Sequence, residues 1–162
     1  MKKFFVVAAL AVLATPLFAA SDMSFDAKVG YARTQTSGNG FVVGPAFYYS
    51  VYQNDGFVKD ISVGLGLDFI MAKIPVAGWA YDMLVGPEAK LEMPYSYFKL
   101  GFGYNYYKCG ASSNSLGMKF GLGGLYEISE GMKMGLDFTF AEKLTSGRMW
   151  TIEIGPVFSF AL

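Results

Sequence analysis

The sequence predicts an all-β protein, a closed barrel of eight antiparallel strands joined up and down. Beyond residue 20, apolar residues alternate with polar residues or glycine almost to the last residue, which is the period of a β-strand. Short segments rich in Gly, Asn, Asp, Ser and Pro interrupt this alternation, as turns do. No run beyond residue 20 approaches the 18 apolar residues of a transmembrane helix.

Each expected strand carries large apolar residues at every second position. In chain order, the strands are expected at residues 23–35, 41–52, 59–72, 79–92, 97–107, 116–128, 132–143 and 148–162. Their alternating apolar positions begin, in the same order, at Met23, Phe41, Ile61, Trp79, Phe98, Leu116, Met132 and Trp150. Strands of this length exceed the 9–11 residues that cross a bilayer at a tilt.

The connections between these strands are short. Turn chemistry is found at residues 36–40, 53–56, 93–96, 129–131 and 145–147, and slightly longer connections are expected at 73–78 and 108–115. The connection at 108–115 holds Cys109, the single cysteine, which we interpret as incidental or as a redox or intermolecular contact. Short connections throughout favour an antiparallel meander.

The N-terminus has the pattern of a signal peptide. Lys2 and Lys3 precede an apolar run over residues 4–13, and residues 16–20 end in the small residues that signal peptidase prefers. Cleavage is expected after Ala19 or Ala20. No cysteine stands directly after that site, so a lipoprotein is not expected. The chain therefore divides into a signal peptide, residues 1–20, and one exported domain, residues 21–162.

The apolar face of the strands is expected on the outside of the barrel. It carries far more large side chains than an eight-stranded barrel can enclose, since comparable interiors hold roughly a dozen. The opposite face carries most of the strand glycines, including Gly44, Gly66, Gly101 and Gly121, and small residues suit a narrow lumen. An outward apolar face favours lipid as its solvent, and a closed sheet satisfies every backbone group there. The barrel is therefore expected to span a membrane.

Charged and aromatic residues agree with this division. No charge lies at the middle of the apolar face, where Arg or Lys costs about 2–4 kcal/mol in lipid. The lumen is expected to hold Tyr48, Tyr52, Asn105 and Tyr107 with a charge network of Asp26, Lys28, Asp68, Asp82, Glu88, Lys90, Glu92, Lys99, Lys119, Glu127, Lys133, Asp137, Lys143 and Glu153. Aromatic girdles are expected at the two membrane interfaces, with Tyr31, Trp79, Tyr81, Tyr106 and Trp150 at one end and Tyr49, Phe98 and Tyr126 at the other.

A Gly-Pro pair recurs in three strands, as residues 43–45, 85–87 and 154–156. Proline removes a ladder donor, so each pair is expected to form a bulge or a bend that aids closure. The faces also predict mutational effects. Leu67→Arg places a charge in lipid and is expected to be costly, whereas Gly66→Ala faces the lumen and is expected to be milder.

An export signal, eight alternating strands and a final strand ending Phe158-Ser159-Phe160-Ala161-Leu162 resemble the small outer-membrane barrels of Gram-negative bacteria. The similar group is the OmpA/OmpX/OmpW-like, porin-family outer-membrane β-barrel domain. The resemblance implies export by the Sec route, residence in the cell outer membrane and contact with its lipid and lipopolysaccharide. It also implies insertion by the barrel-assembly machinery, which usually reads a terminal Phe where this chain has Leu162.

The composition narrows the function. Lys and Arg number 13 and so do Asp and Glu, which leaves no positive field for nucleic acid. The chain has no His, which removes imidazole bases and ligands. The enzymes that resemble this chain in location all use a His, so no enzymatic activity, cofactor or metal is expected.

Two pairs of carboxylates inside the lumen form a candidate site. A turn about residues 75–76 would place Asp68 across from Asp82, and a turn about residues 145–146 would place Asp137 across from Glu153. Close carboxylates can do acid–base work or hold a cation, or inward lysines can neutralise them. The sequence thus favours a structural, envelope-stabilising barrel with an ion-paired, largely plugged lumen. The alternatives are a narrow channel for small or hydrophobic solutes, as in the OmpW group, and a lipid-directed enzyme without His.

Overall fold

The computed structural model describes residues 22–35, 38–74, 78–144 and 149–162. The expected signal peptide, residues 1–20, lies outside these residues. Among the described residues there is no helix long and apolar enough to cross a membrane. The strands are β1 (Met23–Thr34), β2 (Gly38–Gln53), β3 (Asp60–Ile74), β4 (Gly78–Glu92), β5 (Ser96–Cys109), β6 (Ala111–Ser129), β7 (Met132–Lys143) and β8 (Met149–Ala161).

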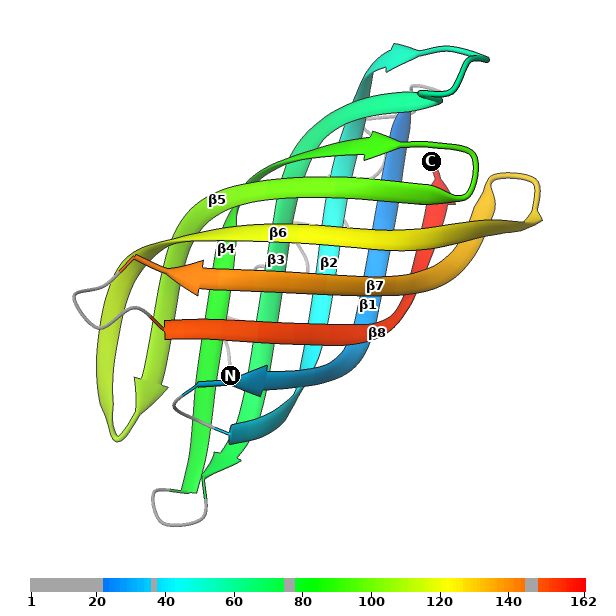
Figure 1. Ribbon diagram of the computed structural model, residues 1–162. Coiled ribbons are helices and arrows are strands. Elements are labelled where there is room, and N and C mark those ends of the chain that lie inside the picture. Colours follow the sequence, from blue (N-terminus) through cyan, green and yellow to red (C-terminus); the bar gives the residue numbers. More distant parts are fainter. Residues whose placement is uncertain (1–21, 36–37, 75–77, 145–148) are drawn as a thin grey trace.

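The eight strands form one closed barrel in chain order, as the alternation predicted (Figure 1). Every neighbouring pair is antiparallel, and β1 closes the ring by pairing with β8 from Ser24↔Ala161 to Thr34↔Thr151. We call the end where β1 begins and β8 ends the terminal end, and the opposite end the distal end. The fold-class prediction is confirmed.

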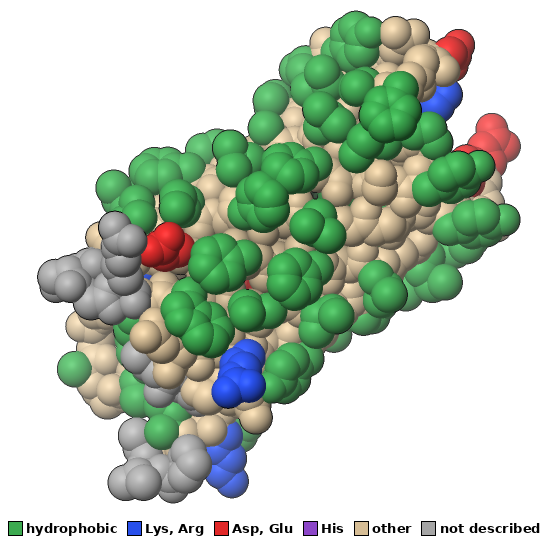
Figure 2. Space-filling model, in the orientation of Figure 1, with side chains coloured by type: hydrophobic (Ala, Val, Ile, Leu, Met, Phe, Trp, Pro, Cys, Tyr) green, Lys and Arg blue, Asp and Glu red, His purple; other side chains and the backbone are tan. Residues whose placement is uncertain are grey.

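The apolar face points outward. Leu65, Leu100, Phe102, Leu122 and Leu136 are each at least 48% exposed although they lie along the strands rather than in turns. Figure 2 shows hydrophobic side chains spread over the barrel wall, with charged side chains mainly toward its two ends. The inward face holds buried polar and charged residues instead. The two faces therefore have the polarity of a barrel that meets lipid outside.

The connection expected at residues 108–115 is much shorter in the structure. β5 continues to Cys109 and β6 begins at Ala111, so the hairpin turns at Gly110, whose φ of 74° favours glycine. Cys109 thus ends a strand rather than lying in a loop. Residues 112–115 are polar on both faces, and they lie beyond the length over which β6 pairs with β7. A stretch that is polar on both faces lacks the alternation of a half-buried strand.

Tyr52 was expected inside the lumen and lies outside it. The register between β2 and β3 shifts between Ser50 and Tyr52, so that Tyr52 pairs with the outward-facing Ile61. Its side chain is 45% exposed. A bulge adds one residue to one strand and moves the following side chain to the other face, which simple alternation does not predict.

The Gly-Pro pairs do not form the expected bulges. At Pro45, for example, the ladder skips from Val43↔Phe69 to Ala46↔Gly66, yet the register on both sides is the same. Pro45 still pairs with β1, at Ala27. The prolines therefore interrupt pairing with one neighbouring strand without inserting an extra residue, and the described register shifts lie at Ser50/Tyr52 and Glu127/Ser129 instead.

Candidate functional site

Lys28 of β1 lies at the centre of a buried ion-pair cluster. Its Nζ is 3.0 Å from Asp68 Oδ1 on β3 and 3.3 Å from Asp137 Oδ1 on β7, and it also donates to Glu153 on β8. All four side chains are at most 4% exposed. Burying an unpaired charge is costly. The charged forms of these four side chains are therefore stable inside the barrel only because they form ion pairs with one another.

Two further lysines complete this central cluster. Lys119 of β6 pairs with both Asp68 and Glu88. Lys99 of β5 lies 2.7 Å from Asp137 Oδ2. The central cluster consists of Lys28, Lys99, Lys119, Asp68, Glu88, Asp137 and Glu153.

Two tyrosines cover the cluster toward the terminal end. Tyr48 donates a hydrogen bond to Glu88 Oε2 at 2.7 Å, and Tyr97 donates to Asp137. Lys90 Nζ lies 5.1 Å and 5.2 Å from the centroids of these two rings, within cation–π range. Lys90 also pairs with Asp26 Oδ2 at 2.8 Å. The two rings and Lys90 thus form a layer across the lumen.

Smaller groups lie on either side of the central cluster. Toward the terminal end, Glu92 accepts from the half-buried Lys133. Toward the distal end, Lys143 pairs with Asp82, which also accepts a hydrogen bond of 2.8 Å from Asn105. Thirteen of the fourteen charges expected inside the lumen are thus brought together in ion pairs, and each of the six lysines meets at least one carboxylate.

Glu127 is the exception. It follows the inward parity of β6 but is exposed, because it lies near the end of the strand just before the register shift between Glu127 and Ser129. It therefore does not belong to the buried network, contrary to the expectation.

The expected carboxylate pairs are wrong in register. Asp82 pairs with Ile70 and Asp68 pairs with Leu84. In the other hairpin, Glu153 pairs with Thr139. Each hairpin is shifted by two residues from the expected one, so the carboxylates are not directly opposite. Lysines, not a second carboxylate, are their nearest charged partners.

Inward glycines leave the space that the network occupies. A Cβ at Gly66 would collide with Glu88 Oε1, and one at Gly121 would collide with the Lys99 side chain. Gly101 faces Lys119 in the same way, with a Cβ only 2.9 Å from its Cε. The glycines of the inner wall are therefore places where long charged side chains cross the lumen.

The lumen also contains apolar layers that alternation did not reveal. Ala32, Val42 and Ile70 form a buried cluster toward the distal end. Leu125 and Val157 form another with Tyr97, toward the terminal end. The sequence places these residues on the inward parity. Apolar Val, Ile and Leu on that mostly polar face do not by themselves predict a buried layer. These apolar layers lie on both sides of the central cluster.

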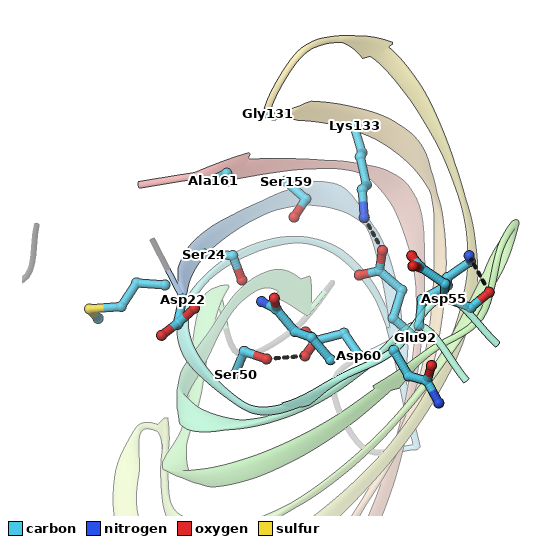
Figure 3. A pocket seen from close by; sticks show the side chains of 14 residues that line it. Asp22, Ser24, Ser50, Asp55, Asp60, Glu92, Gly131, Lys133, Ser159 and Ala161 are labelled. Carbon is cyan, nitrogen blue, oxygen red and sulfur yellow. Dashed lines mark hydrogen bonds and ion pairs between the residues drawn. The ribbon is translucent and has the colours of Figure 1, made fainter. Parts of the chain in front are cut away.

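The empty space inside the barrel is small. Two interior cavities, one beside Asp82 and Lys143 and one beside Asp26 and Glu88, measure about 10 Å³ each. A cavity needs roughly 10–15 Å³ to hold one water molecule. A much larger, open cavity of about 620 Å³ lies at the terminal end, with Glu92 and Lys133 on its wall (Figure 3). It is a vestibule above the ion-paired layers rather than a continuation of them.

The aromatic residues expected at the membrane interfaces lie near the two ends of the outer wall. Tyr31, Trp79 and Tyr81 are 46%, 57% and 36% exposed at the distal end, where Tyr106 and Trp150 are half-buried. At the terminal end, Tyr49, Phe98 and Tyr126 are exposed. This arrangement is typical of interfacial anchoring.

Cysteine and acidic side chains can ligate metal ions. Within the part of the chain that the structure describes, no group of three or more His, Cys, Asp or Glu side chains is arranged to hold a metal ion. The carboxylates of the central cluster face lysines instead.

Known structures share this architecture. No protein-family model and no curated protein sequence matches the chain. Neisserial surface protein A matches with a TM-score of 0.61 and 13% identity, over 86% of this chain and 97% of that one. Ail, the attachment invasion locus protein of Yersinia pestis, matches with a TM-score of 0.57 and 11% identity, over 87% and 100%.

A third similar structure is the outer membrane enzyme PagL, with a TM-score of 0.57 and 10% identity, over 85% of this chain and 99% of that one. The chain thus has the fold of the small outer-membrane β-barrels. At these identities the likeness concerns the fold alone.

Proposed function

We propose that this protein is a non-enzymatic barrel of the bacterial outer membrane whose lumen is closed by ion pairs and whose role is to stabilise the envelope. The observation that carries the proposal is the complete pairing of the inward lysines, each of which meets a carboxylate. A lysine held by a buried carboxylate is not available to bind a charged solute.

The closed lumen follows from the size of the barrel. Eight strands enclose a space that side chains can just fill. Here the Lys90 layer with Tyr48 and Tyr97 lies between the vestibule and the central cluster, and apolar side chains pack above and below. Ion flow would require breaking several buried pairs at once, and each broken pair leaves an uncompensated buried charge.

We propose that the protein has no catalytic function because of the residues that it contains. The chain has no His, so a His-dependent acid–base mechanism has no base. The inward carboxylates, which are the remaining candidates, are engaged with lysines or tyrosines. PagL, which has the same fold, is described as an enzyme, so lipid A analysis of a strain lacking the protein is part of the test.

Residence in the outer membrane is supported by the outer wall. Its apolar band and its two aromatic girdles suit a bilayer. We propose that the chain is exported by the Sec route, inserted by the barrel-assembly machinery through its C-terminal strand and surrounded by outer-membrane lipid and lipopolysaccharide.

The decisive experiment is single-channel recording. The purified, refolded barrel is added to a planar bilayer at neutral pH, with a wide porin as the positive control. We expect no steady conductance from this protein, while unboiled and boiled samples migrate differently on gels, which shows that it is folded. A stable, well-resolved conductance from folded protein would show that the barrel is a channel and would contradict the closed lumen.

The envelope role has its own measurement. A deletion strain should become more permeable to dyes and bile salts, and the wild-type gene should restore the barrier. The same strain should have an unchanged lipid A mass profile. A changed lipid A profile would instead reveal an enzyme.

A further inference from the structure

The outer wall of the barrel has an asymmetric charge distribution. Among the described residues, the outward-facing charges at the distal end are Arg33, Lys73, Lys108 and Glu142. At the terminal end, the exposed charges outside the vestibule are the acidic Glu127 and Glu130. The distal rim is therefore basic and the terminal rim acidic.

Arg33, Lys73 and Lys108 of the distal rim form no ion pair with another described residue. All three side chains are exposed. Residues 36–37, 75–77 and 145–148, which the structure does not describe, contain no Asp or Glu. These exposed cations are therefore accessible to an anion from outside the chain.

Lys73 and Lys108, the two lysines among these rim residues, each lie beside an aromatic residue on an adjacent strand. Lys73 of β3 pairs with Trp79 of β4, and Lys108 of β5 pairs with Tyr81 of β4. Two strand spacings and a two-residue offset separate the two lysine Cα atoms, which is roughly 12 Å. The Tyr81 ring is held in place by stacking on Phe69, with centroids 6.2 Å apart. We call Lys73, Trp79, Tyr81, Tyr106, Lys108 and Asn114 the distal patch.

The distal patch continues directly into the apolar wall. Tyr106 and Asn114 are paired beside Lys108, and Asn114 offers an exposed amide at the same height. Below them, Tyr104 and Phe102 are 45% and 50% exposed. A ligand that fits this surface has anionic groups at the rim, polar groups beside an aromatic surface, and apolar chains that lie along the wall.

We infer that the distal patch binds a bisphosphorylated glycolipid of the lipid A type, with one phosphate at Lys73 and the other at Lys108. This assignment rests on the proposed placement in the outer membrane and goes beyond general contact with lipid, because it names one side of the barrel and two cations. The disaccharide of bisphosphorylated lipid A carries one phosphate at each end. Two separated phosphates match two separated lysines better than the single phosphate of a glycerophospholipid does. Basic residues at a membrane surface contribute about 1 kcal/mol each toward anionic lipid.

The two tryptophans provide a built-in control for the test. The chain contains only Trp79 and Trp150. Trp150→Phe leaves a reporter within the distal patch, and Trp79→Phe leaves one at the same end of the barrel on β8. Bisphosphorylated lipid A is titrated into each variant in zwitterionic micelles. We expect Trp79 fluorescence to saturate at low lipid A concentration and Trp150 fluorescence to change little. Equal responses from both reporters would contradict a localised site.

Charge variants then test the two lysines in the Trp150→Phe background. Lys73→Gln with Lys108→Gln should weaken binding about 30-fold, since each lysine is worth about fivefold. The matched control is Arg33→Gln, a basic residue of the same rim outside the patch, which should change the affinity less than twofold. An equal loss from Arg33→Gln would show that only the overall charge of the rim matters and would reject the site.

Lipid variants identify the ligand. Monophosphorylated lipid A should bind about fivefold more weakly than the bisphosphorylated form, and phosphatidylglycerol should bind more weakly still. If phosphatidylglycerol binds as tightly as bisphosphorylated lipid A, the assignment to a two-phosphate ligand is wrong. Bilayer conductance is measured on the same variants, so that failure of the closed lumen and failure of this site remain distinguishable.

Discussion

Lys28 and Asp68 meet at 3.0 Å across the backbone of the strand that separates them. The intervening residue on β2 is Gly44, which pairs with Lys28. A Cβ at Gly44 would lie 2.6 Å from Asp68 Oδ1 and 3.0 Å from Lys28 Cε. The ion pair therefore occupies the space that a missing side chain leaves, and charge and glycine on the inner wall form one structural unit.

The central position of Lys28 predicts a large effect of its removal. Lys28→Met leaves Asp68, Asp137 and Glu153 without their shared cation, and a buried charge that loses its partner costs about 3–5 kcal/mol. We expect a loss of that order in the free energy of unfolding, measured by urea in zwitterionic detergent. The control, Lys108→Met, removes an exposed lysine and should stay within about 0.5 kcal/mol. Equal effects of the two variants would mean that the lumen charges are not buried in the folded barrel.

The Lys143–Asp82 pair allows a double-mutant cycle. Lys143→Met should destabilise the barrel because, among the described residues, Asp82 then keeps the hydrogen bond from Asn105 but no cation. Adding Asp82→Asn removes the uncompensated charge and should restore most of the loss, with an interaction energy of about 0.5–3 kcal/mol. Additive effects of the two substitutions would show that this pair contributes nothing measurable.

Gly66→Ala is expected to destabilise the barrel, although less than a charge on the lipid-facing wall does. The added Cβ would collide with Glu88 Oε1, so the Glu88 carboxylate must leave Lys119 and Tyr48. Overpacking of this kind costs about 1–3 kcal/mol. Gly56→Ala, in the exposed β2–β3 turn, is the control because its nearest atom is 3.6 Å away. Thermal unfolding of both variants in detergent would reveal the difference, and an unperturbed Gly66→Ala barrel would contradict the observed packing.

Leu67→Arg tests the lipid-facing wall. Leu67 lies on the outward face between the inward Gly66 and Asp68, and it pairs with Val85 of β4. An arginine near the middle of the bilayer costs about 2–4 kcal/mol in a barrel, so folding into lipid vesicles should be weakened by that amount. Leu67→Phe keeps the face apolar and should fold normally. If Leu67→Arg folds into lipid vesicles as well as Leu67→Phe does, this face does not meet lipid.

The sequence by itself determined the strands, their order and their two faces. These features depend on a period of two and on turn chemistry, both of which are local. Leu65, Gly66 and Leu67 already show which side chains point inward, and the glycine-rich, charged parity could not be the lipid-facing one.

The tertiary structure alone decided which charges meet. A shift of two residues in register leaves every side chain on the same face, so alternation cannot distinguish Asp82 opposite Asp68 from Asp82 opposite Ile70, which is the observed pair. The bulge that turns Tyr52 outward depends on one extra residue in β2, and the alternation of the sequence does not predict this bulge. The pair between Lys28 and Glu153 joins residues 125 positions apart. It exists because the barrel closes β1 onto β8, and closure is a property of the whole sheet.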